Sequence, residues 1–433
     1  MAAGINQDGF DRRMAVVKRL LQSLNLQAVN LSTIAYDTQY AYPFNSFLYR
    51  VELAIPASSS VFPGTQPGTT PAPPGGVSTL VVKLSNLAAE GINNANRVQN
   101  DVAAQHIVRQ SMARAGLAPL VPAVYAWAPA TTNDDVKNEE GFGWIMLEWR
   151  SGVDLDAEFS TLEADDKTQV LKQVAAIFKA IQGATLPETV TKFGGLTFDA
   201  SGRIMSAEAP RFQCQPVETY AHWRVFRLRK QLEQAAKSPV IQGWKRNNVD
   251  ARIEKFLASG GPEKVLRGVD LNRKNLIHGD FTTNNMLFDK ATNKITAILD
   301  FDWSFVSHPF DEFTSSLSDL GGKVTLDDDD EVERAILSGD FFAGIAEEPK
   351  EKKDKWQLAK TFSAAMQEAR VTRPSDMLGG ADKIRDLLLF QGMLCPFRLG
   401  NEFMLKQLDD AKKAELRDET EARLVKWLEN HGF

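Results

Sequence analysis

The sequence predicts an α+β protein of two lobes, a small N-terminal lobe rich in β-strands and a larger helical C-terminal lobe. Three observations lead to this prediction. The 433 residues exceed what one compact core of ordinary size takes up. Alternating apolar residues, typical of strands, dominate as far as Trp149, and helical spacing dominates from Leu162 onward. Because strands and helices segregate along the chain, we expect lobes of residues 1–149 and 150–433.

The N-terminal lobe is expected to combine a strand-rich sheet with helices. Phe47, Tyr49, Val51, Leu53 and Ile55 alternate with polar residues, which is the period of a strand with one buried face. Similar patterns continue along the lobe. They predict helices at 10–24 and 95–116 and further strands at 78–87, 122–129 and 141–149.

A segment rich in Pro, Gly, Ser and Thr, residues 56–76, separates the first two of these strands. Such a composition cannot bury a core and is typical of a mobile loop. The flanking strands could pair, so a long hairpin loop fits better than a domain boundary. On this interpretation, deletion of Ser58–Gly75 should cost little stability.

Helical spacing dominates the C-terminal lobe, most clearly at 167–182, 217–236 and 415–429. The exception is a pair of short apolar stretches, MLFD and KITAIL, separated by turn residues 290–294. This pattern predicts a β-hairpin.

Composition narrows the classes of function. The net charge of −6 provides no basic stripe, so nucleic acid is not an expected partner. No apolar run is long enough to cross a bilayer, and the N-terminus lacks the pattern of a signal peptide. Cys214 and Cys395 are too few for a disulfide framework. We therefore expect a cytoplasmic protein with no membrane partner.

The segment LIHGDFTTNNMLFD, residues 276–289, and the following AILDFDW, residues 297–303, indicate a chemistry. The predicted hairpin returns the chain to its start, so Asn285 before it and Asp300 after it should lie together. An amide oxygen and a carboxylate at one place suit Mg²⁺ held jointly with phosphates. Asp280, upstream on the same loop, is free to orient and deprotonate a hydroxyl, as phosphoryl transfer requires. The alternative, ordinary turn residues, would have to explain all three residues and the hairpin.

This stretch resembles the catalytic loop of the aminoglycoside phosphotransferase and choline kinase group, which shares the protein-kinase fold. The matching residues are His278–Asp280, Asn285 and Asp300–Asp302. The resemblance implies a two-lobed protein kinase-like fold, ATP and Mg²⁺ as cofactors, and transfer to a hydroxyl of a small acceptor. It implies Asp280 as the catalytic base, Asn285 and Asp300 as metal ligands, and His278 as a support of the loop. Asp302 is expected either to touch a second metal or to cap the next turn.

The resemblance also predicts a lysine on the third strand, paired with a carboxylate on the next helix. Lys83 in LVVKLS and Asp101 match, although the group usually has Glu at the second position. A lysine inside an apolar strand needs a partner. The alternative is a lysine on an edge strand, facing water.

Two further nucleotide contacts follow from the resemblance. The stretch GWIMLEW resembles the hinge against which adenine lies, so backbone groups of Glu148 and Arg150 would face the base, beside Met146. The chain has YAYPFNSFLYRV in place of a glycine-rich phosphate loop. Asn45 and Ser46 are therefore the candidates for phosphate contact.

The acceptor is not specified by any motif. Aminoglycoside- or choline-like acceptors would favour acidic surroundings, but the acidic run 327–333 is as expected for a solvated helix N-terminus. An alternative function is a kinase-fold protein that binds nucleotide or a protein partner without catalysis. The glycine-free loop favours it, whereas the joint presence of Asp280, Asn285 and Asp300 argues against it. A protein kinase is not expected, because DWSFVSHPFDEF leads directly into a helix.

Overall fold

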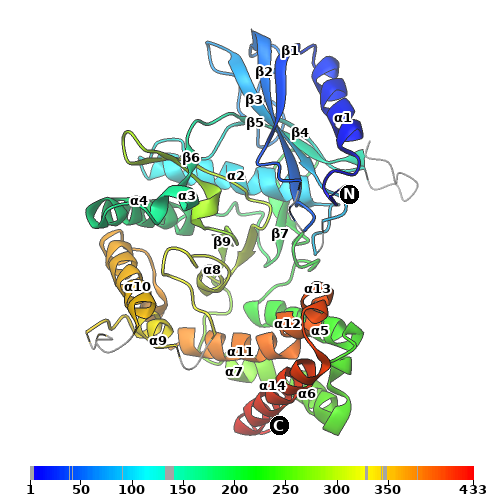
Figure 1. Ribbon diagram of the computed structural model, residues 1–433, viewed down its shortest axis with the longest axis vertical. Coiled ribbons are helices and arrows are strands. Elements are labelled where there is room, and N and C mark those ends of the chain that lie inside the picture. Colours follow the sequence, from blue (N-terminus) through cyan, green and yellow to red (C-terminus); the bar gives the residue numbers. More distant parts are fainter. Residues whose placement is uncertain are drawn as a thin grey trace. The chain divides into compact units, whose positions relative to one another are not determined.

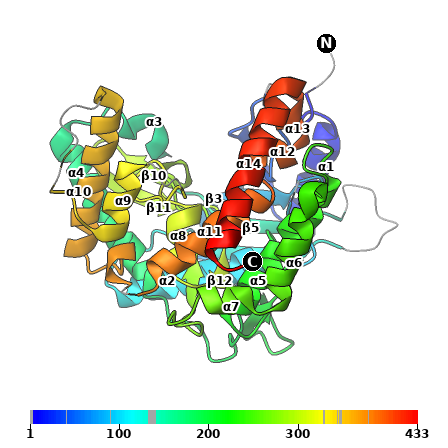
Figure 2. The same ribbon diagram turned by 90° about the horizontal axis from the view of Figure 1, so that it is seen from below.

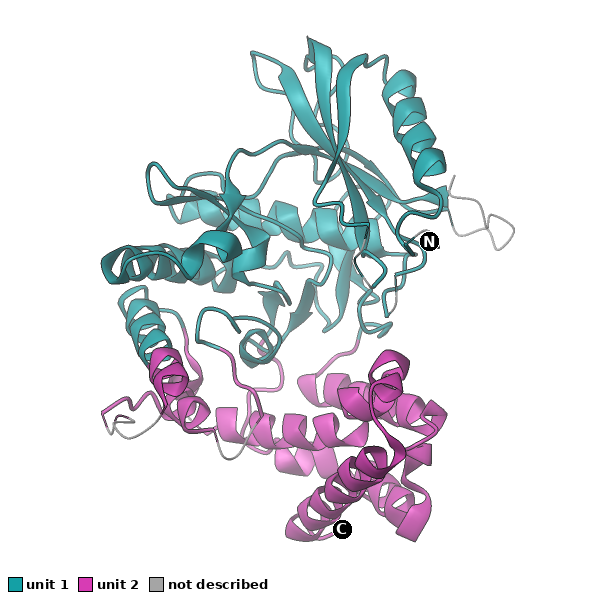
Figure 3. Ribbon diagram, in the orientation of Figure 1, with its two compact units in different colours: residues 1–216, 274–322, 357–371 teal, residues 217–273, 323–356, 372–433 magenta. Residues whose placement is uncertain are grey.

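We describe a computed structural model of the chain, which covers residues 4–38, 40, 42–89, 91–131, 141–326, 330–342, 344, 349–377 and 379–433. Its contacts divide the chain into two compact units (Figure 3). Unit 1 comprises residues 1–216, 274–322 and 357–371, and unit 2 comprises 217–273, 323–356 and 372–433. The predicted boundary between residues 149 and 150 therefore falls inside unit 1, which joins the N-terminal sheet to the predicted hairpin.

An antiparallel sheet of five strands forms the first part of unit 1, in the order β1-β2-β3-β5-β4 (Figure 1). The strands are β1 (Ala28–Ile34), β2 (Ser46–Ala57), β3 (Val77–Ser85), β4 (Val124–Ala128) and β5 (Trp144–Glu148). Four of them were predicted. The prediction missed β1, an edge strand whose residues are exposed or half-buried and lack clear apolar alternation. The predicted α+β class with an N-terminal sheet is confirmed.

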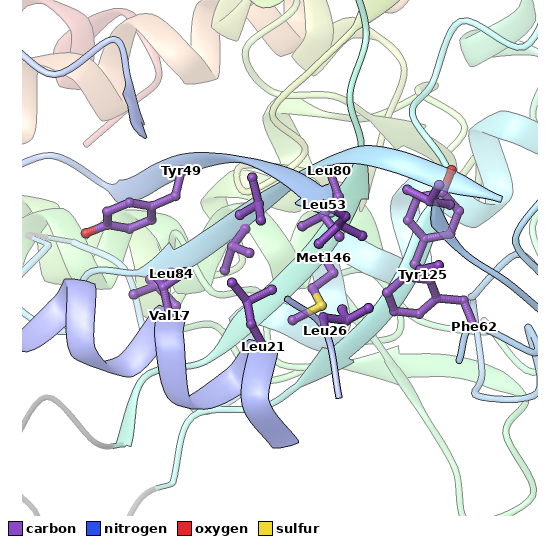
Figure 4. Close-up of a cluster of buried hydrophobic side chains, with 14 of the residues drawn as sticks. Val17, Leu21, Leu26, Tyr49, Leu53, Phe62, Leu80, Leu84, Tyr125 and Met146 are labelled. Carbon is purple, nitrogen blue, oxygen red and sulfur yellow. The ribbon is translucent and has the colours of Figure 1, made fainter. Parts of the chain in front are cut away.

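The predicted helix α1 (Phe10–Ser23) covers one face of the sheet. Figure 4 shows Val17 and Leu21 of α1 among Leu53, Leu80 and Met146 of the strands. The predicted alternation in β2 holds as far as Leu53, which is 7% exposed. It fails at Ile55, which is 78% exposed, because the pairing of β2 with β3 changes register after Glu52.

Helix α2 (Arg97–Arg114) packs against residues that point to the other face of the sheet, since successive strand residues alternate between faces. Val98 and Val102 of the helix form a small core with Val124 and Ile145 of β4 and β5. Val82 and Leu84 belong to the α1 side. The residue between them, Lys83, therefore points toward α2.

Residues 56–76 do bury apolar side chains, so the expectation that they could not is wrong. Phe62 is 1% exposed and stacks on Tyr125 of β4 at a ring distance of 5.2 Å. The side chain of Gln66 bonds the backbone of Trp127 in both directions, and Thr70 N–H donates to Val124 O at 2.8 Å. The composition was a poor guide because one aromatic residue and a few backbone contacts suffice to anchor a loop. The predicted pairing of the flanking strands is confirmed.

Phe62→Ala should therefore lower the free energy of unfolding by about 3 kcal/mol, through lost burial and the cavity left behind. Urea denaturation of the whole chain measures this difference. Ser59→Ala, at an exposed position of the same loop, is the matched control and should change stability by less than about 0.5 kcal/mol. Equal stability of the two variants would restore the mobile-loop interpretation.

The rest of unit 1 consists of helices and short strands around the predicted hairpin. The helix α4 (Ala164–Gln182) lies beside the C-terminal part of α10 (Lys350–Glu368) (Figure 1 and Figure 2), and Lys172 pairs with Glu368 at 3.0 Å. The small sheets have the orders β11-β10-β6, β12-β9 and β7-β8. The elements are β6 (Val153–Asp154), α3 (Leu155–Phe159), α4 (Ala164–Gln182), β7 (Gly195–Phe198), β8 (Ile204–Ala207), β9 (Asn275–Ile277), β10 (Met286–Asp289), β11 (Lys294–Ile298), β12 (Phe305–Ser307) and α8 (Phe310–Ser315).

Among its described residues, unit 2 consists mainly of helices joined by turns and loops. Its helices are α5 (Tyr220–Lys237), α6 (Val249–Ala258), α7 (Gly261–Val265), α9 (Glu331–Ser338), α11 (Ala381–Leu394), α12 (Phe397–Gly400), α13 (Glu402–Lys406) and α14 (Asp410–Asn430), and α10 (Lys350–Glu368) is shared between the units. The helices predicted at 167–182, 217–236 and 415–429 are confirmed as α4, α5 and α14.

The predicted acidic run lies at the start of α9. Residues 327–329 of the run lie outside the described residues. Asp330 caps the helix by accepting from the N–H groups of Val332 and Glu333. The run was expected to be solvated, and for Glu333 this expectation is wrong. Glu333 is 1% exposed and pairs with Arg385. Across the described ranges, no helix combines the length and apolar character needed to cross a membrane.

Candidate active site

The loop that holds Asp280 is fixed between two paired strands. β9 leads into it and pairs with β12, with Ile277 opposite Phe305. Gly279 has φ +81°, and a Cβ there would lie 2.3 Å from Trp303 O, so the position requires glycine. The glycine of the His-Gly-Asp motif therefore has a local steric reason, in addition to any chemical one.

The predicted hairpin forms and brings Asn285 and Asp300 to the same place. β10 and β11 pair antiparallel, with Met286 opposite Ile298. Leu299 N–H then donates to Asn285 O at 2.8 Å, which joins the residues that flank the hairpin. Asp300 follows directly, in the left-handed region with φ +58°. The expected closeness of these segments is confirmed, and it follows from the hairpin register.

Asp280 and Asn285 contact each other within the loop. Asn285 Nδ2 donates to Asp280 Oδ2 at 2.9 Å and to Asp280 O at 2.8 Å. The amide nitrogen thus faces the carboxylate of Asp280. Burial raises the pKa of Asp280 above its ordinary value, and the bond from Asn285 opposes that shift. Asp280 is half-buried and bonded to Asn285, and the roles of the two residues as base and metal ligand stay predictions.

The short 3-10 turn Thr283–Asn285, which presents Asn285, is held by two carboxylates. Thr283 N–H donates to Asp319 Oδ2 at 2.5 Å, and its hydroxyl donates to Asp156 Oδ1 at 3.2 Å and also to Asp319. These contacts fix the backbone on which the amide of Asn285 depends.

Lys83 lies at the centre of a buried group of charges, here called the ion cluster: Lys83, Arg97, Asp101, Asp300 and Asp302. Lys83 Nζ is 2.9 Å from Asp101 Oδ2, 3.1 Å from Asp300 Oδ1 and 3.1 Å from Asp302 Oδ1. Burial by itself would lower the pKa of Lys83, but the three carboxylates raise it well above its ordinary value. The predicted pair with Asp101 forms. The edge-strand alternative is wrong, because β3 lies between β2 and β5 and Lys83 is 6% exposed.

Asp302 is bound inside the ion cluster. Its Oδ2 lies 2.6 Å from Arg97 Nη2, and Ser46 Oγ donates to the same oxygen at 3.2 Å. Burial disfavours its charge, but Arg97 and Lys83 hold the pKa of Asp302 below its usual range. With a side chain 2% exposed and already occupied by cations, Asp302 is held in place by protein groups.

The ion cluster carries two cations and three carboxylates, a formal balance of 2 − 3 = −1. The side chains of Asp101 and Asp302 are 0% and 2% exposed, whereas that of Asp300 is 37% exposed. Asp300 is thus the one carboxylate of the ion cluster that a cation could reach from solvent, and the cluster's net negative charge would favour its binding. Among the described residues, no three His, Cys, Asp or Glu side chains converge as a metal site. An amide oxygen and one accessible carboxylate fit Mg²⁺, which shares its ligands with phosphates and water.

The predicted phosphate-contact residues adjoin the ion cluster. Arg97 Nη2 donates to Asn45 O at 2.7 Å and to Ser46 Oγ at 2.9 Å. Asn86 N–H also donates to Asn45 O, at 3.0 Å. These bonds tie the beginning of β2 to α2 and to Asp302. Contact of Asn45 or Ser46 with phosphate stays a prediction.

The predicted hinge lies at the end of β5. Glu148 N–H donates to Ala123 O at 2.8 Å, so this N–H is not available to adenine, and contact through the Glu148 carbonyl stays a prediction. The Glu148 carboxylate accepts from Ala123 N–H at 3.0 Å and pairs with Arg150 Nε at 3.3 Å. Met146 is fully buried in the α1 side of the core. Adenine contact by the backbone of Arg150 stays a prediction.

Two buried side chains support the loop behind Asp280. Glu312 accepts from His278 N–H at 2.6 Å and from Gly279 N–H at 3.0 Å, and burial raises its pKa to about 7 against these bonds. His278 is 0% exposed, and burial lowers its pKa to about 4, so the ring is neutral. Its Nε2 then donates to Leu299 O at 3.2 Å. The expected supporting role of His278 agrees with these contacts.

Sequence reasoning did not identify Arg97 or Glu312 as part of the site. Arg97 lies in α2 one turn before Asp101. An arginine on a helix usually faces solvent, so the sequence did not single it out. Glu312 follows the strand that pairs with β9, in the segment HPFDEF, for which the sequence predicted only the start of a helix. Neither residue gave a clear signal in the sequence, because both stand among other polar residues, in ANRVQND and HPFDEF.

Comparison with known proteins gives two kinds of similarity. A sequence model described as the phosphotransferase enzyme family (APH) matches residues 74–346. No curated protein sequence matches the chain. Among solved structures, an aminoglycoside phosphotransferase from Ralstonia eutropha, itself described as unconfirmed, is 14% identical, with 95% of this chain and 98% of that chain covered and a TM-score of 0.46.

Two other solved structures show similar values. The ADP-bound aminoglycoside phosphotransferase APH(2'')-Ib is 12% identical, with coverage of 96% of this chain and 98% of that chain and a TM-score of 0.46. Ethanolamine kinase from Plasmodium vivax is 9% identical, with coverage of 91% and 82% and a TM-score of 0.40.

Proposed function

Because the chain belongs to the phosphotransferase enzyme family, we propose that it is an ATP- and Mg²⁺-dependent kinase that phosphorylates a hydroxyl group of a small molecule. The observation that carries the proposal is the convergence of Asp280, Asn285, Asp300 and Lys83 in one site of unit 1. Aminoglycoside- and choline-like compounds are the first acceptors to test. A cytoplasmic location, suited to the free thiols of Cys214 and Cys395, belongs to the same proposal.

In this proposal Asp280 acts on the acceptor hydroxyl. The hydroxyl proton passes to the Asp280 carboxylate as the acceptor oxygen bonds to the γ-phosphorus. The bond from that phosphorus to the β–γ bridging oxygen breaks, and ADP leaves. The Asn285 amide keeps the carboxylate oriented through the bond at 2.9 Å. A carboxylate that is half-buried and not paired with lysine is available for this proton.

Asn285 and Asp300 would hold Mg²⁺, which neutralises phosphate charge when it is bound. Asp300 is suited to this because it is the exposed carboxylate of the ion cluster. Lys83 would bind phosphate oxygens, with Asp101 fixing its position from α2. The three N–H donors of Lys83 face three carboxylates. Phosphate binding therefore requires Lys83 to exchange one of these contacts, and Asp300 is the partner that a metal would take over.

The three carboxylates that contact Lys83 also favour a second candidate function. This alternative is a kinase-fold protein that binds nucleotide or a partner without catalysis. If Lys83 keeps all three carboxylates when nucleotide binds, the phosphates lack their cation. Phosphate transfer to any acceptor, in a screen of aminoglycosides and hydroxyl-bearing metabolites with radiolabelled ATP, would exclude this alternative.

Thermal melting with and without Mg-ATP tests the nucleotide site directly. At about a hundredfold its dissociation constant, Mg-ATP should add about 2.7 kcal/mol to the stability of the wild-type chain, and chelation of Mg²⁺ should remove this gain. Asp300→Asn should lose the Mg²⁺-dependent gain. Asparagine readily adopts the left-handed conformation of residue 300, so this variant should fold.

Asp354→Asn, at an exposed position of α10, is the matched control and should respond to Mg-ATP as the wild type does. An equal Mg²⁺-dependent gain in Asp300→Asn would remove Asp300 from the metal site. No gain in any of the three proteins would contradict the proposed use of ATP.

A further inference from the structure

Arg211 lies beside the Asp280 loop, and its positive charge has no role in the proposed reaction so far. Its Nη1 donates to Gly279 O at 3.3 Å, and its guanidinium carbon lies 3.9 Å from the ring centre of Trp303. In the described part of the chain, no carboxylate oxygen lies within 4.0 Å of this guanidinium. A guanidinium has five N–H donors, of which Gly279 occupies one.

The position of Arg211 is fixed by the backbone around it. Residues 209–214 form a tight turn, in which Phe212 N–H donates to Ala209 O at 3.3 Å and Ala209 pairs with Cys214. Asn93 N–H donates to Pro210 O at 2.9 Å, and Phe212 packs edge-on against Phe305 of β12 at 5.1 Å. The guanidinium is therefore held against the loop by a packed segment of unit 1.

Two more deeply buried arginines of the chain each have a carboxylate partner. Arg97 pairs with Asp302 at 2.6 Å, and Arg417 pairs with Glu421 at 2.6 Å. At Arg211, burial lowers the pKa to about 10 and the more distant Asp280 only partly opposes this, so the group stays protonated at neutral pH. Arg211 is half-buried, and a cation that is partly removed from water without a paired anion is unfavourable. An anion that bound there would relieve this cost.

We propose that Arg211 binds an anionic group, through phosphate or carboxylate oxygens, directly beside Asp280. The planar fork of the guanidinium matches such groups with two parallel hydrogen bonds, and stacking on Trp303 leaves its edge available for them. Two ligands share this chemistry. One is the phosphoryl group during transfer, and the other is an acidic group on the acceptor. The first rests on the proposed function, and the second would make the acceptor more acidic than an aminoglycoside or choline.

The test compares the full-length wild type with Arg211→Gln and Arg211→Lys. Arg203→Gln is the matched control, because Arg203 lies on the nearby β7–β8 hairpin with a side chain 69% exposed. The first measurement is the ratio of the affinities for Mg²⁺-bound β,γ-imido-ATP and for Mg-ADP. The second is the rise in melting temperature caused by inorganic phosphate, with β,γ-imido-ATP saturating and ionic strength held constant with NaCl.

If Arg211 binds the transferred group, Arg211→Gln should lower the affinity ratio at least tenfold and leave Mg-ADP affinity unchanged. If it binds an acidic group of the acceptor, phosphate should stabilise the wild type and Arg203→Gln but not Arg211→Gln. Arg211→Lys, which keeps the charge and loses the fork, should weaken either effect at least threefold. This variant decides the question if Arg211→Gln does not fold.

The inference is overturned if both substitutions leave the affinity ratio and the phosphate response as they are in the wild type. Arg211 would then serve only to hold the Gly279 carbonyl and the Trp303 ring. Failure of the proposed function gives a different result, because the wild type itself would bind neither nucleotide. In that case the phosphate response without nucleotide, and its loss in Arg211→Gln, still tests the anion site.

Discussion

Asp280→Asn should reduce kcat by at least 10³-fold and leave the affinity for Mg-ATP within about twofold of the wild type, as expected for loss of a general base. The reason is that Asp280 acts on the acceptor and not on the nucleotide. The substitution should leave the loop intact, because an asparagine oxygen can still accept the bond from Asn285 Nδ2 that now reaches Asp280 Oδ2 at 2.9 Å.

Steady-state kinetics with an acceptor found in the screen, and calorimetric titration with Mg-ATP, measure the two quantities. Asp354→Asn again serves as the control, with unchanged kcat. A variant at residue 280 that kept more than a tenth of wild-type kcat would exclude Asp280 as the base. Loss of Mg-ATP affinity in that variant would indicate that Asp280 belongs to the nucleotide site.

Arg97→Met should lower the free energy of unfolding by about 3–5 kcal/mol, because it leaves Asp302 buried with only Lys83 as a counter-ion. Arg97 is 0% exposed, and it also bonds Asn45 O and Ser46 Oγ. The substitution should therefore also loosen the start of β2, where the predicted phosphate contacts lie. Urea denaturation measures the stability. Arg114→Met, at the exposed end of the same helix, is the control and should cost less than about 0.5 kcal/mol.

A double-mutant cycle separates the ion pair from the lost packing. Once Arg97 is methionine, Asp302→Asn removes the uncompensated charge, so the second substitution should cost less than it does in the wild type. We expect a coupling of about 1–3 kcal/mol between the two positions. Additive costs would show that Arg97 stabilises the protein by packing and not by holding Asp302.

The chemistry around Asp280 could be predicted because it depends on short spacings in the sequence. A glycine that alone fits against Trp303, and a hairpin that brings Asn285 and Asp300 together, are consequences of local geometry. The alternation of apolar residues likewise identified four of the five strands of the sheet. Lys83 could be singled out because a charge inside an apolar strand requires a partner.

The partners themselves were decided by the tertiary structure. Arg97 and Asp302 are 205 residues apart in the chain, and Lys83 and Asp300 are 217 apart, so no local pattern connects them. The packing of Phe62 and the bonding of the Glu148 N–H also depend on which strand comes to lie beside them. The sequence by itself determined the local geometry of the loop and the type of chemistry. Tertiary packing decided which charges are buried and what compensates them, because burial is a property of the whole fold.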